Sequence, residues 1–116
     1  MVFLEYPKCS TCKKAKAWLE DNNAEYTDRN IKDQNPDIEE LKEWYQRSGL
    51  PLKKFFNTSG MLYREMNLKE KLPSMSEDEM LALLATDGML VKRPLVIGDD
   101  FVLVGFNVQE WESKLL

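Results

Sequence analysis

The stretch Val2–Cys12, which reads VFLEYPKCSTC, decides the fold expected of this chain. Its first five residues are mostly apolar, which predicts a short strand in the centre of a sheet. Pro7 ends that strand. In the segment that follows, apolar residues recur on one face at helical spacing, which predicts a helix over Lys13–Asn22. A Cys-x-x-Cys pair therefore lies between a buried strand and the start of a helix.

The rest of the chain extends this beginning into a recognisable order of elements. A second strand is expected at Glu25–Ile31, and the resulting β-α-β unit favours a parallel pairing with a right-handed crossover. Near the other end, Pro94–Ile97 and Phe101–Val104 predict a hairpin, and Asn107 is expected to cap a last helix. The order β-α-β followed by β-β-α is that of an α/β fold with a thioredoxin-like core.

The middle of the chain predicts helices that are inserted into this core. Asn35 is expected to cap the first of them, and Gly49 to end it. A capping box that begins at Ser76 opens another. We therefore expect a single domain over residues 1–116, with a helical insertion over about 35–90.

Composition excludes several classes of function. The 116 residues include 16 basic and 20 acidic side chains, a net charge of −4, which argues against direct binding of nucleic acid. No apolar run is long enough to span a membrane and no signal peptide is evident, so the cytoplasm is the expected location. There is no histidine, which excludes Ser-His-Asp machinery, and two cysteines are too few ligands for a structural zinc ion. We expect no metal.

The cysteine pair is the strongest candidate for chemistry. Unpaired N–H groups and the helix dipole favour an anion at a helix N-terminus, so this position lowers the pKa of a thiol and makes it reactive. Lys8 and Lys13 add positive charge nearby. Because Cys9 lies at the turn and Cys12 one turn inward, we expect Cys9 to attack and Cys12 to resolve the adduct as an internal, redox-active disulfide.

Other interpretations of the pair stay open at this point. A Cys-x-x-Cys can be half of a metal site, although the second half is missing here. The two cysteines can also be inert small apolar residues in a structural domain, or a structural disulfide, which a reducing cytosol disfavours.

The dipeptide Arg93-Pro94 is the second feature. A proline that opens a strand in this architecture is often cis and faces the cysteine turn. Arg93 beside it is suited to bind an oxyanion, a carboxylate of a glutathione-type thiol, or the thiolate itself. The alternative interpretations are a strand-edge proline and a solvated charge.

Several motifs together resemble the arsenate reductase-like (ArsC) family, including its Spx branch of redox-sensing transcription regulators, over nearly the whole length. The motifs are YPKCSTCKK from Tyr6, LKKFFNTSG from Leu52, ATDGML from Ala85, VKRPLV from Val91 and VGF from Val104. The resemblance implies a thioredoxin-like fold with a helical insertion. It also implies that Cys9 is the catalytic cysteine and that Arg93 binds the oxyanion.

The resemblance also bears on the substrate and the partners. Glutaredoxin-linked arsenate reductases have two further arginines, near Asn57 and Gly105, where this chain has none. Together with the second thiol, this favours disulfide chemistry or sensing over arsenate reduction. We expect Lys13, Asn57 and Pro94 to contact the substrate. A thiol system such as glutathione, glutaredoxin or thioredoxin would act as reductant, with no bound cofactor. The alternative is an Spx-like regulator that binds the RNA polymerase α subunit.

Overall fold

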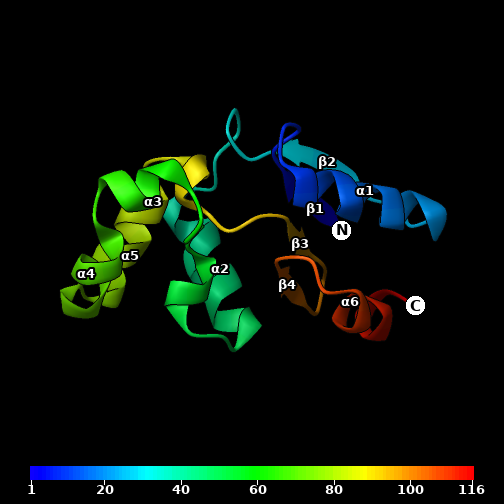
Figure 1. Cartoon of the computed structure of the whole chain (residues 1–116). Coiled ribbons are helices and arrows are strands. Elements are labelled where there is room, and N and C mark those ends of the chain that lie inside the picture. The colour runs from blue at the N-terminus through cyan, green and yellow to red at the C-terminus, as the bar shows by residue number, and fades with distance from the viewer.

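A four-stranded sheet organises the computed structural model, which describes residues 1–116 (Figure 1). The strands are β1 (Val2–Glu5), β2 (Thr27–Asn30), β3 (Leu95–Ile97) and β4 (Val102–Val104), and they lie in the order β2-β1-β3-β4. β1 pairs parallel with β2 and antiparallel with β3, and β3 and β4 form the predicted hairpin. The expected central place of the first strand is confirmed.

The helices fall into two groups (Figure 1). α1 (Ser10–Asp21) and α6 (Val108–Leu115) belong to the core with the sheet. The insertion contains α2 (Ile38–Ser48), α3 (Met61–Glu65), α4 (Leu68–Lys71), α5 (Glu77–Leu84) and three short 3-10 turns, η1 (Leu52–Phe55), η2 (Leu72–Ser74) and η3 (Gly88–Leu90). None of these helices has the length and apolar character that crossing a bilayer requires.

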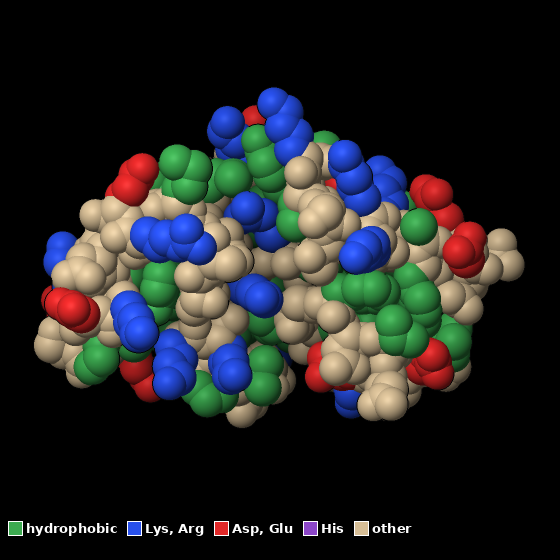
Figure 2. Space-filling model, viewed as in Figure 1, with side chains coloured by type: hydrophobic (Ala, Val, Ile, Leu, Met, Phe, Trp, Pro, Cys, Tyr) green, Lys and Arg blue, Asp and Glu red, His purple; other side chains and the backbone are tan.

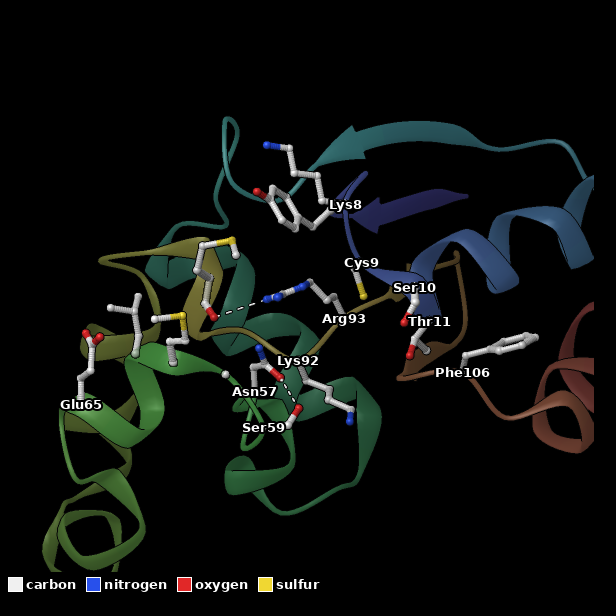
Figure 3. Close-up of a pocket in the computed structure, with 15 residues that line it drawn as sticks. Lys8, Cys9, Ser10, Thr11, Asn57, Ser59, Glu65, Lys92, Arg93 and Phe106 are labelled. Atoms are coloured by element: carbon white, nitrogen blue, oxygen red, sulfur yellow. Dashed lines mark hydrogen bonds between the residues drawn. The ribbon is translucent and has the colours of Figure 1, made fainter.

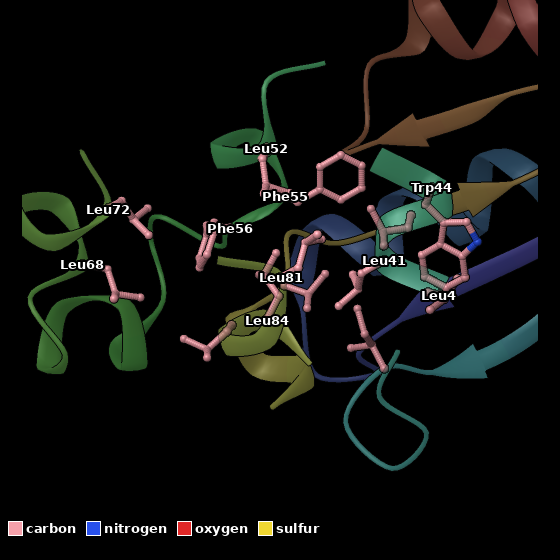
Figure 4. Packing of buried hydrophobic residues seen from close by; sticks show 14 residues of the cluster. Leu4, Leu41, Trp44, Leu52, Phe55, Phe56, Leu68, Leu72, Leu81 and Leu84 are labelled. Atoms are coloured by element: carbon pink, nitrogen blue, oxygen red, sulfur yellow. The ribbon is translucent and has the colours of Figure 1, made fainter. Parts of the chain in front are cut away.

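Alternation along β1 divides the buried side chains into two clusters. Phe3 packs with Ala15 and Leu19 of α1 and with Trp111 of α6. Leu4 points to the opposite face, into a larger cluster that joins the sheet to the insertion (Figure 4). Because neighbouring strand residues point to opposite faces, a central strand with both faces covered is apolar throughout.

Two predicted boundaries differ from the structure. The first helix begins at Ser10 rather than Lys13, so Cys9 itself is the N-cap residue. The helix expected to be capped by Asn35 is capped by Asp37, whose carboxylate accepts the N–H of Glu40 at 2.8 Å in a capping box. The Asn35 amide instead donates to the carbonyl of Ala85, 50 residues away, a contact that no local pattern shows.

The insertion is hydrogen-bonded to the segment that precedes β3. Phe56 and Val91 form an isolated antiparallel bridge. The N–H of Lys92 donates to the carbonyl of Phe55 at 2.7 Å, and the N–H of Asn57 donates to that of Leu90 at 2.8 Å. These bonds bring the Asn57 loop to the residues immediately before Pro94.

One buried carboxyl group was not expected from the sequence. Glu5, at the end of β1, is only 3% exposed, and its Oε2 lies 3.5 Å from Nζ of Lys16 on α1. Burial raises the pKa of Glu5 to about 7, and a hydrogen bond with Asp28 and the negative charge of that residue add to the effect, while Lys16 opposes it. Glu5 therefore keeps its proton over much of the mildly acidic range.

Replacing Glu5 with glutamine should change how stability depends on pH. Unfolded Glu5 loses its proton near its ordinary pKa of 4.5, whereas the folded protein holds that proton up to about 7. The stabilisation from the raised pKa is therefore present below 4.5 and is lost as the pH rises through 7. Glu5→Gln keeps a neutral donor at every pH. In urea unfolding, the free energy of unfolding of the variant should rise relative to that of the wild type by about 1–3 kcal/mol as the pH is raised from about 4 to about 8.

The exposed carboxylate Glu25 provides the matched control, since Glu25→Gln should follow the wild type across the same range. Parallel curves for Glu5→Gln and the wild type would mean that Glu5 is already ionised when the protein is folded.

Candidate functional site

The turn between β1 and α1 positions Cys9. Its N–H donates to the carbonyl of Tyr6 at 2.9 Å, and its carbonyl accepts the N–H of Lys13 at 3.0 Å, the first bond of the helix. Partial burial of Cys9 acts to raise the pKa of its thiol. The backbone and side chain of Cys12, the charge of Arg93 and the N–H of Thr11 more than offset this and leave the pKa below its usual value. Cys9 is therefore suited to be a thiolate.

Cys12 has the opposite character. Its side chain is fully buried on the inner face of α1, and burial is the main cause that raises its pKa to about 12. Both cysteines are free thiols in this structure. The two sulfur atoms thus lie one helical turn apart, one facing the surface as the stronger acid and the other held protonated behind it.

Arg93 lines the same cavity as Cys9, and its positive charge acts on the thiol. The Arg93-Pro94 peptide bond is cis, as expected. The guanidinium lies 5.4 Å from the centre of the Tyr6 ring, and Nη1 donates a long hydrogen bond of 3.4 Å to the carbonyl of Met89 (Figure 3). Its Nε is buried and has no hydrogen-bond partner, and no carboxylate lies within 4.0 Å of the side chain. The guanidinium keeps unused donors beside the cysteine turn.

A cavity of about 740 Å³ opens in front of these residues. One wall is the cysteine turn with Lys8, and the opposite wall is the loop from Asn57 to Gly60 and the start of α3 (Figure 3). Asn57 is only 8% exposed, and its Oδ1 accepts a hydrogen bond of 3.3 Å from Ser59 Oγ. Cationic, hydroxyl, amide and apolar groups therefore surround the exposed face of Cys9.

The structure brings some of the predicted site residues together and leaves others outside the cavity. Cys9, Arg93 and Asn57 line it, and Cys12 lies directly behind Cys9. Pro94 is buried next to Arg93 and does not line the cavity. Lys13 is exposed on α1 and does not line the cavity, so its contact with substrate stays a prediction.

Sequence reasoning did not assign a role to several lining residues. Ser59 comes from the loop after Asn57, Met61 begins α3, and Lys92 precedes Arg93. The LKKFFNTSG motif was the available signal for the loop, but only the bonds between the insertion and the segment before β3 show that it faces the cysteines. Separately, no cluster of three or more Cys, Asp or Glu side chains could hold a metal ion.

Comparison with known proteins assigns this fold to a family. The model of the ArsC family matches residues 4–113. The chain belongs to the ArsC family. Its thioredoxin-like core with a helical insertion is the fold that its solved ArsC relatives share. An ArsC family related protein from Bacteroides fragilis superimposes with a TM-score of 0.95 at 63% identity, over 97% of this chain and 94% of that one.

Other ArsC relatives differ in what their names say. YusI of Bacillus subtilis, an uncharacterised protein, is 59% identical over 98% of this chain and 97% of its own length. Arsenate reductase from Vibrio cholerae superimposes with a TM-score of 0.81 at 28% identity, over 100% of this chain and 98% of that one. Global transcriptional regulator Spx 1 of Bacillus cereus is 31% identical over 90% of this chain and 78% of its length.

The two thiols of this ArsC protein should differ sharply in reactivity. We expect iodoacetamide at neutral pH to modify Cys9 and leave Cys12 unmodified in the native protein, as peptide mass mapping would show. Arg93→Met should slow alkylation of Cys9 about threefold to tenfold, because one opposite charge is removed from beside the thiolate. Arg93→Lys retains that charge and should have a smaller effect. Equal modification of both cysteines would contradict the assigned environments.

Proposed function

We propose that this ArsC protein is a thiol-disulfide oxidoreductase in which Cys9 is the nucleophile, Cys12 the resolving thiol and Arg93 the anion-binding group. The observation that carries the proposal is the arrangement of the two sulfurs. One faces a cavity at the start of α1, and the other is buried one turn behind it. A pair in which only one thiol faces the cavity and ionises readily supports a defined order of attack.

The reaction proceeds in two exchange steps. The Cys9 thiolate attacks a substrate disulfide, so that a Cys9–substrate disulfide forms and one substrate sulfur leaves as a thiolate. Cys12 then attacks Cys9, closes the internal disulfide and gives its proton to the second departing sulfur. Two electrons pass from the cysteine pair to the substrate. A cellular thiol system, such as glutathione, glutaredoxin or thioredoxin, supplies the electrons that reduce the pair again. The proposal therefore includes a cytoplasmic location, where such systems keep thiols reduced.

Arsenate reduction has less support from the residues that line the cavity. Arg93 is the only arginine there, and the position occupied by Asn57 offers an uncharged amide. Gly105 has a φ of 78°, a left-handed conformation that an arginine adopts only with strain. The lysine charges at Lys8 and Lys92 provide general attraction for anions rather than the bidentate contacts of guanidinium groups.

Substitution of the cysteines separates the two roles. Cys9→Ser should abolish disulfide reduction, a loss of at least about a thousandfold, because a serine hydroxyl at this site stays protonated at neutral pH. In the Cys12→Ser variant, Cys9 should still attack the substrate disulfide. The mixed disulfide on Cys9 should then accumulate, and intact-mass spectrometry would detect it. Retention of turnover by Cys9→Ser would overturn the proposal. Formation of this mixed disulfide would also show that the Cys12→Ser variant is folded with a reactive Cys9.

A redox-gated regulator is the second candidate, favoured by the similarity to Spx 1 over most of this chain. In that case the disulfide would alter a protein surface, and the end of α2 is the candidate contact, where Leu50 is 39% exposed beside Gly49. The partner would be the RNA polymerase α subunit.

Binding to the polymerase subunit gives a direct test of this second function. The immobilised α subunit should retain one redox form of the protein more strongly than the other, and a Leu50→Glu change, which introduces a negative charge, should reduce retention about tenfold. Cys9→Ser with Cys12→Ser gives the permanently reduced control. Absence of binding in both redox states would exclude the regulator and leave the enzyme.

A further inference from the structure

A second cavity of about 530 Å³ adjoins the site and shares Lys92 with it. It lies between the insertion, which contributes η1 and Tyr63 of α3, and the core, which contributes Val104 of β4 and Glu110 of α6. Lys92 occupies the segment that joins the two walls, immediately before Arg93. The two cavities therefore follow one another along the boundary between insertion and core, with Cys9 in the first.

The charges in this second cavity are mainly positive and unpaired. Lys53, Lys54 and Lys92 line it, and none of them has a carboxylate within 4.0 Å. Glu110 is its only acidic residue, as Glu65 is in the first cavity. Figure 2 shows lysine and arginine side chains around the hollow in the middle of this face and acidic side chains toward its margins. The whole chain has a net charge of −4, so the positive charge around the second cavity is opposite in sign to that of the protein as a whole.

The second cavity also has an apolar part. Leu50 and Tyr63 line it on the insertion side, and Val104 on the core side. A small inorganic anion would use the lysines but not these side chains. An extended peptide would use both, because its carboxylates would reach the lysines while its backbone and apolar groups cover the apolar side chains.

We propose that the two cavities form one substrate cleft, and that the preferred substrate is an acidic peptide segment of a protein disulfide. Its cysteine reacts with Cys9, and its neighbouring carboxylates lie along Lys92, Lys53 and Lys54. The inference rests on the proposed function and adds a substrate class to it. The chemistry is the exchange described above, with the peptide sulfur bonded to Cys9 in the intermediate, and reduction by Cys12 releases the peptide thiol.

Peptide disulfides of different charge test the cleft. The probes are peptides with a single cysteine coupled to thionitrobenzoate, whose release is coloured. The acidic probes carry glutamates before or after the cysteine, and their counterparts carry glutamine or lysine at the same positions. The reduced wild type should react with at least one acidic probe about tenfold faster than with its glutamine counterpart, and added salt should lower this ratio.

Lysine variants assign the effect to the second cavity. Lys53→Gln with Lys54→Gln should reduce the acidic-to-neutral rate ratio about threefold to tenfold. The matched control is Lys69→Gln with Lys71→Gln, which removes the same charge from exposed positions on α4 outside both cavities and should leave the ratio unchanged. Comparing the ratio within each variant corrects for any general change in Cys9 reactivity.

The possible failures are distinguishable. Equal rates for acidic and neutral probes, or an equal loss in the α4 control, would overturn the cleft and leave the oxidoreductase intact. If no probe reacts faster with the wild type than with Cys9→Ser, the oxidoreductase is itself overturned, and the substrate class falls with it.

Discussion

The burial of β1 on both faces is the constraint on which the site depends. Phe3 packs against α1 and α6, and Leu4 packs into the cluster shared with the insertion. Each side chain contributes about 1.5–3 kcal/mol through burial, so the strand has one register and one orientation. Its end at Glu5 then leaves only a short turn before α1. Cys9 must therefore be the residue that meets the first N–H groups of the helix.

The difference between the two sulfurs follows from that geometry. A helix that packs one face against a sheet exposes its first turn at the end of the sheet and buries the position one turn further along. Cys9 occupies the first environment and Cys12 the second. The same protein scaffold thus stabilises negative charge on one sulfur and opposes it on the other, in a chain that has no histidine. Arg93 reaches the pair from a different part of the chain and adds the charge that the helix alone does not supply.

Local patterns were sufficient to predict the elements and the residues of the reactive turn. The strand, the apolar face of the first helix and the hairpin are each encoded within a few neighbouring residues, and Gly49 ends α2 in a left-handed conformation as expected. The errors arise where distant segments compete for a side chain. Asn35 is a good cap by type, but its amide bonds the carbonyl of Ala85, and Asp37 caps the helix instead. The burial of Glu5 likewise depends on α1 lying across β1, and the alternation of side chains along β1 does not show where that helix lies.

The bridge between Phe56 and Val91 has a consequence for how the proposed cleft would discriminate among substrates. Because backbone hydrogen bonds tie the insertion to the segment that leads to Arg93, the two sides of the reactive region are ordered by folding itself. Recognition then needs no hinge closure, and association immobilises the incoming molecule rather than a loop of the receptor. The proposed cleft would therefore select substrates by the fixed spacing of its charged side chains. A peptide whose carboxylates are spaced differently would bind weakly, because the cleft does not change shape to match it.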